Sequence, residues 1–532
     1  MTEHSEKKRI AIVGGGISGI SCMWKLRDTD WDVHLYDADS RLGGHANSSK
    51  FEGNGYSASV DTGFVVMHEG FYPKFNAFLK ALNVETVPTD MSFGVSADGG
   101  SFEWTSVSFM GFLGSFYNIF SLWFWRLIFD IIRFHYCATD IFHEQSVAQQ
   151  CMKATCLRQK HDAKCTHSQN LESIGQYLDR KSYSEQFKKY YLVPMGAAPR
   201  CIDPNEFERD FPATTFIRFM YEHELLDTIS KTCRWRAFKN GSKTYIDAFL
   251  KTLKPNQHIH LETPVTSVKR DMNDKVTLLT KDGSTEVFDQ VVLAVHANQA
   301  LQILGDGATP NEKEILRHFK TTRNICYLHS DETLMPRRET AYASWNVLMK
   351  SSSNKPLKRV TEKMRLFSKE LSMVKKIRDE RIEKISITFD MNRLQGIPMP
   401  GESGSPGRAL VSMNPIHTPR GVRASFVYYH PLFTSNSVLA LKRMHLINGV
   451  STVSFAGAWM GHGFHEDGCR AGMDAADELL KIAEAGKYAL LSDNAEVSQK
   501  ENFKEKRSMK TAACRVMIRG IQILIEISEA YM

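Results

Sequence analysis

The stretch "AIVGGGISGISCMWKL", residues 11–26, runs from an apolar segment into a glycine-rich turn and decides the fold of the N-terminal part of the chain. Gly14, Gly16 and Gly19 stand at the G-x-G-x-x-G spacing, and the residues after them are apolar at helical intervals. A strand, a turn and a helix in this order are typical of the first unit of a dinucleotide-binding domain. There the first glycine permits the turn, the second lets a pyrophosphate approach the backbone, and the third lets helix pack on strand.

The next apolar run, "WDVHLYDAD" at residues 31–39, supplies an acidic residue at the end of a second strand. Asp37 lies 18 residues beyond Gly19. A carboxylate there can accept hydrogen bonds from both ribose hydroxyls and would repel a 2′-phosphate, which argues against NADP. NAD and FAD both remain open on these residues.

A second glycine-rich loop lies at "DADSRLGGHANS", residues 37–48. Arg41, Gly43 and Gly44 form a loop that can approach a phosphate, which a nicotinamide dehydrogenase does not need at this point. The segment "SASVDTGFVV", residues 57–66, then reads as a strand and a turn, where Gly63 allows a close approach of the backbone.

Near the other end, "TVSFAGAWMGHGFHEDGCRAGMDAADELL" at residues 452–480 reads as strand, loop and helix. The positive N-terminal end of such a helix stabilises a negative charge near it. Gly457 directly follows the strand.

Together these segments resemble the FAD-dependent flavoproteins of the amine oxidase type. The resemblance implies FAD as the cofactor, with Arg41 and the amides of the second loop on its pyrophosphate and Gly63 close to the flavin. It also implies that the backbone at Val265 holds the adenine. At the flavin edge the implied residues are Gly457, Trp459, Phe464 and Gly468. Ala458 departs from many relatives, which have an acid there.

Further segments narrow the resemblance to one branch. They are "VDTGFVVMHEGFYPKFNAFLKALNV", "YYLVPMGAA", "LMPRR" with "ASWNVL", "DMNRLQ" and "WMGHGFHEDGCRAG". The branch is related to the N-terminal half of plant cyclopropane-fatty-acid synthases, and the match runs from about residue 8 to 485. Its relatives imply a substrate with an unsaturated acyl chain. The chain departs from them at Pro199 to Cys201, where family members commonly read "PMGAAIWS" instead of "PMGAAPRC".

The chain of 532 residues is too long for one core, and we expect an α/β fold of amine oxidase or flavin monooxygenase-like architecture. A discontinuous Rossmann-like FAD-binding domain is predicted from residues 1–70, 240–300 and 450–485. An α+β substrate domain is predicted from residues 71–239 and 301–449. Residues 486–532 are expected to form a charged linker and an apolar helix.

The apolar segment at 107–136 contains residues 111–129, which carry one charge, Arg126. The length would just permit a membrane span, but the position inside the substrate domain argues against one. A pair of helices that line an acyl tunnel or dip into one leaflet fits better, with Phe116 and Phe124 facing the tunnel, while a plain core helix remains the alternative. In the tail, Met517, Ile518, Ile521, Leu524 and Ile525 recur at helical spacing.

Charge and cysteine content exclude some classes of protein. The net charge of +7 is mild, and no basic run with interleaved aromatic residues indicates a nucleic-acid partner. The polar first ten residues contain no secretory apolar stretch, so we expect a cytoplasmic protein with reduced thiols and at most a peripheral contact with a membrane. The pairs Cys151 with Cys156 and His161 with His167, together with Cys165, are spaced poorly for zinc, so no metal site is predicted.

Three classes of function remain open. The first is an oxidoreductase or isomerase that transfers hydride between a lipid acyl chain and flavin N5. The second is an amine oxidase, and the third is a non-catalytic flavoprotein beside a lipid-modifying enzyme. Phe464 aligns with the aromatic residue, usually tyrosine, that walls the substrate site of amine oxidases, and phenylalanine is a poorer cage for an amine cation. His465 is the other catalytic candidate; with Glu466 and Asp467 it could instead only order the loop.

Overall fold

The computed structural model describes residues 7–146, 171–226, 234–271, 275–351, 382–485 and 509–530. Its first sheet contains five parallel strands in the order β10-β2-β1-β14-β20. The strands are β1 (Arg9–Val13), β2 (Asp32–Tyr36), β10 (Gln257–His260), β14 (Gln290–Leu293) and β20 (Val453–Phe455). The central strands β2, β1 and β14 and the edge strand β20 are almost wholly buried, as expected for a parallel sheet covered on both faces.

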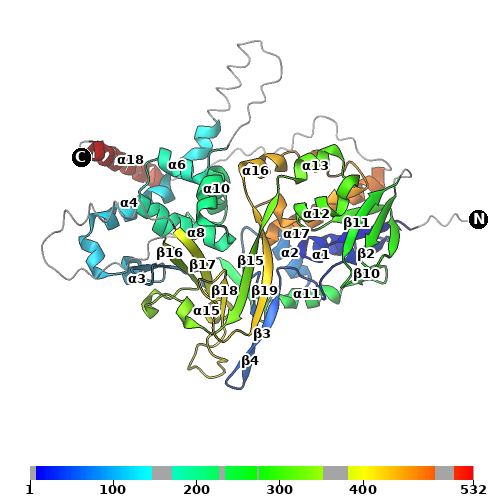
Figure 1. The fold of residues 1–532 in the computed structure, drawn as a ribbon, viewed down its shortest axis with the longest axis horizontal. Coiled ribbons are helices and arrows are strands. Elements are labelled where there is room, and N and C mark those ends of the chain that lie inside the picture. Colours follow the sequence, from blue (N-terminus) through cyan, green and yellow to red (C-terminus); the bar gives the residue numbers. More distant parts are fainter. Residues whose placement is uncertain are drawn as a thin grey trace, which may run out of the picture.

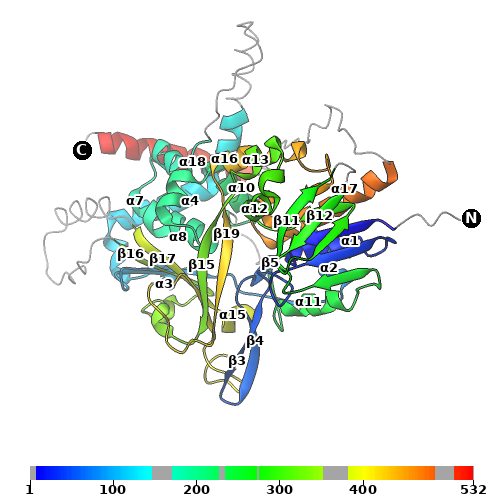
Figure 2. The same ribbon diagram turned by 45° about the vertical axis from the view of Figure 1, so that its right-hand side comes forward.

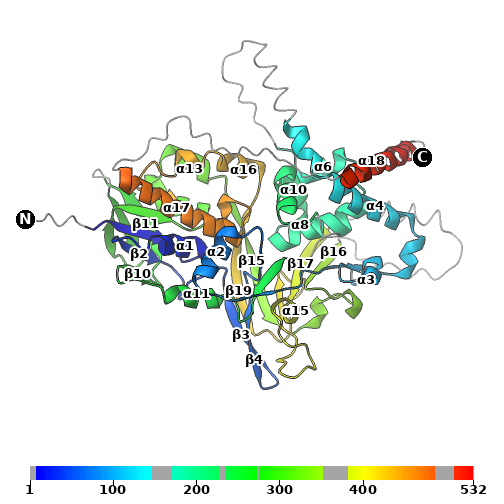
Figure 3. The ribbon, with the colours of Figure 1, turned by 180° about the vertical axis from the view of Figure 1, so that it is seen from behind.

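Two helices lie side by side on one face of this sheet, α1 (Ile17–Lys25) and α17 (His465–Ala485) (Figure 3). Ser21 Oγ on α1 donates a hydrogen bond to the carbonyl of Cys469 on α17 at 3.0 Å. A Cβ at Gly472 would lie 2.0 Å from the carbonyl oxygen of Ser18, so this glycine permits the close contact. The two helix N-termini are thereby held next to each other.

The other face is covered by a small antiparallel sheet and by two helices. These elements are β11 (Val265–Arg270), β12 (Val276–Thr280), β13 (Thr285–Phe288), α12 (Ala297–Leu304) and α13 (Pro310–Leu316). Their apolar side chains share one core with Val291 and Leu293 of β14. Helix α11 (Lys243–Leu250) and helix α2 (Pro73–Ala81) contribute to the core under α1 and α17 (Figure 1).

A second sheet of seven strands has the order β19-β15-β18-β17-β16-β7-β8. It is antiparallel except where β16 pairs with β7. The strands are β7 (Phe93–Ala97), β8 (Phe102–Thr105), β15 (Lys320–His329), β16 (Trp345–Ser351), β17 (Ile382–Asp390), β18 (Leu410–Met413) and β19 (Ala424–Leu432). Short helix α15 (Met391–Gln395) lies between β17 and β18 of this sheet, and α16 (Ser435–Leu441) follows β19 on the way to β20.

Helices cluster at the end of this sheet farthest from the N-terminus (Figure 2). They share the largest core with the sheet. The cluster contains α3 (Phe109–Leu113), α4 (Leu122–Cys137), α6 (Ile174–Arg180), α7 (Glu185–Phe187), α8 (Val193–Ala197), α9 (Pro204–Asp210) and α10 (Ala213–Glu222). The remaining strands form the hairpin β3 (Ser48–Gly53) and β4 (Tyr56–Asp61) and the small sheet β5 (Val66–His68), β9 (Trp235–Phe238) and β6 (Thr86–Pro88).

The apolar segment forms three short helices rather than a pair. Gly114 ends α3 with a φ of +68°, 3-10 helix η1 (Phe116–Phe120) follows, and α4 begins at Leu122. The expectation that Phe116 and Phe124 face a tunnel is wrong: Phe116 is 62% exposed, and Phe124 is 1% exposed within the core. Over the described residues, the protein contains no helix with both the length and the apolar character needed to cross a bilayer.

The tail forms helix α18 (Met509–Ala530), which packs against α4 (Figure 2). Arg515 donates to Asp140 at 3.1 Å and to Thr139 at 2.8 Å, and Ile518 is buried. Met517, Ile521 and Leu524 are exposed, so they do not form a docked side with Ile518. The cysteine and histidine pairs at 151–167 and the linker at 486–508 lie outside the described residues.

Candidate functional site

One large cavity extends from the parallel sheet to the helices beside the second sheet. Its volume is about 1330 Å³. Small-molecule sites usually have a volume of roughly 300–1,000 Å³, so the cavity has room for a dinucleotide together with a second molecule. Its lining residues come from the loops that follow strands of the parallel sheet, from strands of the seven-stranded sheet and from the helices beside that sheet.

The glycine loop after β1 forms one end of the cavity. Gly14, Gly16, Asp37, Gly43 and Gly44 line it, together with the first residues of α1. A Cβ at Gly16 would have no atom within 4 Å, so the space beside this backbone is open. The N-terminus of α1 lies at the same space, and its free N–H groups suit the phosphates of a dinucleotide.

The two phosphate loops predicted from the sequence are in direct contact. The amide of Gly43 donates to the carbonyl of Gly15 at 2.8 Å, and Gly16 and Gly43 form a parallel β-bridge. The carboxylate of Asp37 accepts hydrogen bonds from the amides of Gly15 and Asp39. Burial raises the pKa of Asp37, while these two amide donors oppose the change. The acid and both loops thus surround one end of the cavity.

Four of the residues predicted from the sequence do not line the cavity: Gly19, Arg41, Val265 and Gly468. A Cβ at Gly19 would lie 1.9 Å from the carbonyl oxygen of Gly14, and one at Gly468 would lie 2.7 Å from Ile17. These two glycines therefore permit close packing. The guanidinium of Arg41 donates to carbonyls of its own loop, including Gly44 O at 2.9 Å. Val265 is the first residue of β11, outside the cavity lining.

Three of the histidines that line the cavity lie close together and were not expected from the sequence: His45, His296 and His430. Burial holds the pKa of His45 well below its usual range and lowers the pKa of His430 to about 4, so both rings are neutral. Nε2 of His45 is buried without a hydrogen-bond partner. A polar ligand such as the ribityl or phosphate part of FAD would supply one, so this orphaned atom fits a cofactor here. The only signal in the sequence is that His45 directly follows Gly44.

The loop before α17 lines the cavity next to these histidines. Gly457, Trp459, Phe464 and His465 belong to the lining, as do Gly63 and Ala458. Trp459 is buried and donates from Nε1 to the carbonyl of Val295 at 3.0 Å, which fixes the loop to the end of β14. The N-terminus of α17 faces the same space as that of α1, so two positive helix ends converge on the site.

The imidazole of His465 is held firmly. It stacks on Phe64 with ring centroids 3.8 Å apart, and its Nε2 lies 2.8 Å from the hydroxyl of Tyr245. Burial lowers the pKa of His465 to about 3, so the ring is neutral near pH 7. Neutral imidazole at this position cannot act as an acid there, and its Nε2 is already engaged by Tyr245.

The two acids after His465 order the loop. The carboxylate of Glu466 accepts hydrogen bonds from the amides of Lys74 and Phe75, at the start of α2. Asp467 accepts one from the amide of Phe464 at 3.0 Å. Both acids are thus bound to backbone donors, and their contacts position Phe464 at the cavity wall.

The far end of the cavity is mostly apolar and reaches the molecular surface, although Asp90, Glu224 and Arg234 also line the cavity. Its lining includes Trp104, Phe109, Phe112, Ile128, Ile131, Met195, Phe219, Trp235, Trp345, Phe389 and Phe433. Phe109 on α3 is 75% exposed and lines the cavity as well. The cavity therefore opens beside α3 and α4, at the place where the apolar segment lies.

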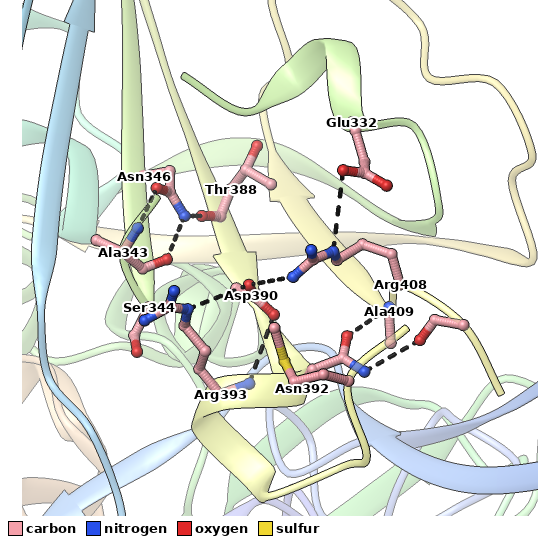
Figure 4. A network of polar contacts seen from close by, with 12 residues as sticks. Glu332, Ala343, Ser344, Asn346, Thr388, Asp390, Asn392, Arg393, Arg408 and Ala409 are labelled. Carbon is pink, nitrogen blue, oxygen red and sulfur yellow. Dashed lines mark hydrogen bonds and ion pairs between the residues drawn. The ribbon is translucent and has the colours of Figure 1, made fainter. Parts of the chain in front are cut away.

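A buried polar network supports the wall behind this end (Figure 4). Asp390 is fully buried and pairs with Arg408 at 3.0 Å, and Asn346 bonds to Ala343 and Thr388 across β16 and β17. The neighbouring Trp345 and Phe389 line the cavity, and their rings pack edge to face with centroids 4.8 Å apart. The segments "ASWNVL" and "DMNRLQ" thus serve the structure of the wall.

One group of potential metal ligands occurs within the described ranges: Asp32, His34 and His258. It lies on β2 and β10, and none of its members lines the cavity. Asp32 also pairs with Arg9 at 3.2 Å, and this cation competes with any metal ion for the carboxylate.

Comparisons with known proteins agree with this geometry. A model of the flavin-containing amine oxidoreductase family matches residues 17–329. Among curated proteins, 4,4'-diaponeurosporene oxygenase of Staphylococcus haemolyticus is 42% identical over 50 residues, which are 9% of this chain and 10% of that protein. The matched part of this chain thus spans about a tenth of that relative.

Solved structures share the fold at low sequence identity. A fatty acid isomerase from P. acnes superposes with a TM-score of 0.55 at 12% identity, covering 89% of this chain and 99% of the isomerase. Cyclohexylamine oxidase from Brevibacterium oxydans gives a TM-score of 0.54 at 14% identity, covering 90% of this chain and all of the oxidase (100%). The α/β fold of amine oxidase architecture predicted from the sequence is confirmed. The chain belongs to the flavin-containing amine oxidoreductase family and is an FAD-dependent oxidoreductase.

Proposed function

We propose that the protein oxidises, desaturates or isomerises an unsaturated fatty acyl substrate. The observation that carries the proposal is the continuity of the cavity, from the glycine loop of α1 to an apolar opening beside α3 and α4. An acyl chain needs many apolar contacts, because each methylene removed from water contributes only ~0.8 kcal/mol. The aromatic and aliphatic far end supplies such contacts. That a fatty acid isomerase shares the fold supports this substrate class.

The proposed cofactor contacts follow from the cavity lining. The open backbone at Gly16 and the adjacent loop of Gly43 and Gly44 would hold the pyrophosphate, and Asp37 the adenosine ribose. The N-terminus of α17 would stabilise negative charge on the flavin ring. His45 would bond the polar chain between the two halves of FAD through its orphaned Nε2.

Bound flavin supplies hydride acceptance at N5, and the chain supplies a dry and fixed environment. Phe464 stacks on Phe219 with centroids 5.0 Å apart, and both rings line the cavity. The two rings make this part of the wall apolar and exclude water from it. An apolar acyl chain therefore fits against them better than a polar group does. We assign His465 a structural role in the cavity wall rather than proton transfer, since its neutral ring is held between Phe64 and Tyr245.

Peripheral contact with a membrane is part of the same proposal. Residues 107–125 contain no charged side chain. Their exposed members include Phe109, Met110, Phe116, Tyr117, Phe120, Leu122 and Trp125. Exposed aromatic and aliphatic side chains of this density mark an interaction surface, and aromatic residues favour the lipid interface. A lipid substrate would then enter the cavity beside Phe109 without crossing water.

Anaerobic flavin spectroscopy with two panels of compounds tests the proposed substrate class. Long-chain unsaturated fatty acyl compounds are expected to reduce the flavin or perturb its spectrum, whereas short amines and polyamines leave it unchanged. Steady turnover of an amine without any response to acyl compounds would overturn the lipid proposal. A flavin that responds to neither panel would indicate a non-catalytic partner of a lipid-modifying enzyme.

The second candidate function is amine oxidation. Solved structures with this fold include cyclohexylamine oxidase and a putrescine oxidase bound to putrescine. Amine oxidation predicts that a primary or secondary amine rapidly bleaches the flavin and that peroxide is released in air. The aromatic wall at Phe464 favours the acyl substrate, because phenylalanine is a weaker partner for a cation than tyrosine or tryptophan.

A further inference from the structure

A buried arginine stands in the otherwise aromatic wall of the cavity. Arg200 ends the 3-10 helix η3 (Ala198–Arg200), is 6% exposed and lines the cavity. Its guanidinium lies 4.0 Å from the ring centroid of Phe219 and 5.5 Å from that of Phe464. Phe211 and Phe216 are also within 5.6 Å of it. A full positive charge is therefore placed among phenylalanine rings at the wall of the substrate space.

Most N–H donors of this guanidinium have no hydrogen-bond acceptor among the described residues. Nη1 donates to the carbonyl of Gly196 at 3.3 Å, and Nε is buried without a partner. No ion pair joins Arg200 to a carboxylate anywhere in the described part of the chain. A guanidinium has five N–H donors, so most of its capacity remains available.

The other buried arginines of the described residues behave differently. Arg133 pairs with Asp130 at 3.3 Å, and Arg515 pairs with Asp140 at 3.1 Å. An unpaired buried charge is costly, because desolvation is not compensated. Burial lowers the pKa of Arg200 to about 9, which leaves it cationic at pH 7. The cation is thus retained without any carboxylate partner among the described residues.

The ionisable groups on the neighbouring elements do not neutralise it. Glu222 is engaged by His462 at 3.1 Å, and Glu224 is engaged by Arg234. Burial lowers the pKa of His223 to about 3, so this ring is neutral beside Phe219. These two carboxylates therefore already have partners, and the space at Arg200 suits an anion brought by a ligand.

We propose that Arg200 binds the carboxylate of a free fatty acid whose chain extends through the apolar part of the cavity. The inference rests on the acyl substrate proposed above and names its head group. A planar guanidinium binds a carboxylate through two parallel hydrogen bonds, and a site shielded from water strengthens them.

The test compares a long-chain unsaturated fatty acid with its methyl ester, using the flavin spectrum of the holoenzyme as the reporter. The wild-type protein is expected to bind the acid at least roughly tenfold more tightly than the ester, because only the acid completes the charged pair. Arg200→Gln is expected to lose this preference through weaker acid binding and unchanged ester binding. Arg200→Lys should keep part of the preference, since it retains the charge but not the planar fork.

A matched control is Arg209→Gln. Arg209 is an exposed arginine on α9 that pairs with Asp210 and does not line the cavity. This variant should keep the wild-type preference for the acid. Thermal melting of each holoenzyme separates a binding effect from a loss of folding.

The outcomes distinguish this inference from the proposed function. Equal binding of acid and ester by the wild-type protein would overturn the role of Arg200 and leave the acyl substrate standing. A flavin that responds to neither compound would overturn both. If Arg200→Gln weakens both ligands equally and lowers the melting temperature, Arg200 has a structural role only. If that variant does not fold, the wild-type preference and Arg200→Lys decide the question.

Discussion

Gly16 and Gly19 lie three residues apart, yet a side chain at each would meet opposite surroundings. A Cβ at Gly16 would point into the open cavity, whereas one at Gly19 would lie 1.9 Å from the carbonyl oxygen of Gly14. Gly16 has a φ of −71°, which any residue adopts without strain. The missing side chain therefore leaves room for a ligand at Gly16, whereas at Gly19 it permits close packing of the backbone.

Gly16→Val is expected to abolish FAD binding without unfolding the protein, because its side chain fills space meant for the pyrophosphate. Gly19→Ala should instead destabilise the fold by roughly 1–3 kcal/mol through overpacking. Flavin absorbance after purification measures the first effect, and thermal or urea unfolding of the apoprotein measures the second. Full FAD content in Gly16→Val would contradict the assigned pyrophosphate position.

Asp61 is a second residue whose surroundings make a measurable prediction. It is fully buried, and its Oδ1 accepts hydrogen bonds from Ser48 and from the amide and hydroxyl of Ser242, while Oδ2 has no partner. Burial raises the pKa of Asp61 to about 7, although these donors oppose the rise. The folded state therefore binds a proton that the unfolded chain has released.

This proton makes the free energy of unfolding fall as pH rises. Below the usual pKa of the unfolded carboxyl, about 3.9, both states are protonated and the contribution is fully present. It is lost between that pH and about 7, at up to ~1.4 kcal/mol per pH unit. Asp61→Asn cannot titrate, so the difference between wild-type and variant stability should change across this window in urea unfolding. A pH-independent difference would contradict the raised pKa.

At the scale of elements, the short helices α3, η1 and α4 combine two surfaces. Their inner side chains, such as Phe112 and Ile128, line the cavity, while Phe116 and Phe120 are 62% and 69% exposed. Helix α18 packs beside α4 (Figure 1). It exposes further apolar side chains, including Met517 and Leu524. A single region thus contains the opening of the cavity and a dense group of exposed apolar side chains.

Replacing Phe116 and Phe120 together by serine is expected to weaken binding to phospholipid vesicles and to spare FAD content. The reason is that these side chains are exposed and lie outside the cavity lining. Co-sedimentation with vesicles measures the binding. Val287→Ser is the control, because Val287 is also exposed but lies on β13, away from the apolar segment. Vesicle binding that is unchanged in the double variant would remove the membrane contact from the proposal.

At the scale of the whole molecule, the cavity joins parts that are far apart in the chain. Residues near 14, 45, 200, 296, 430 and 464 all line it. A ligand in this cavity therefore contacts the loops that follow strands of the parallel sheet and the strands of the seven-stranded sheet at once. Ligand binding of this kind stabilises only the folded chain and couples the two parts.

FAD is accordingly expected to raise the thermal transition of both parts of the molecule together. At a free FAD concentration of 100 times the Kd, the stabilisation is about 2.7 kcal/mol. Differential scanning calorimetry of apoprotein with and without added FAD measures the shift. Gly16→Val is the control and should show no shift, since it cannot hold the cofactor. A shift confined to one of two separate transitions would show that the cavity does not couple them.

The sequence alone was sufficient where the chemistry is local. The strand, the glycine spacing and the following helix occupy neighbouring residues, so their pattern is enough to bring Gly14, Gly16 and Asp37 together, and the structure places all three in the lining of the cavity. The α/β architecture follows from the same motif and its closing partner at Gly457. The spacing of apolar residues did not predict the contacts of the apolar segment. It identifies an apolar helix but does not show which of its faces meets the core. For that reason Phe116 and Phe124 were misplaced.

Only the tertiary structure decided the chemistry of the substrate space. Arg200 is one arginine among many in the sequence, and no local pattern distinguishes it from the others. The rings of Phe219 and Phe464 that surround it come from separate segments, as do the histidines that gather near the unpartnered Nε2 of His45. Burial and the absence of a partner are properties of a packed assembly, so no local pattern encodes them. The sequence therefore determined the cofactor and the fold. Only folding placed the cation of Arg200 among the aromatic rings of the cavity wall, because those rings come from distant parts of the chain.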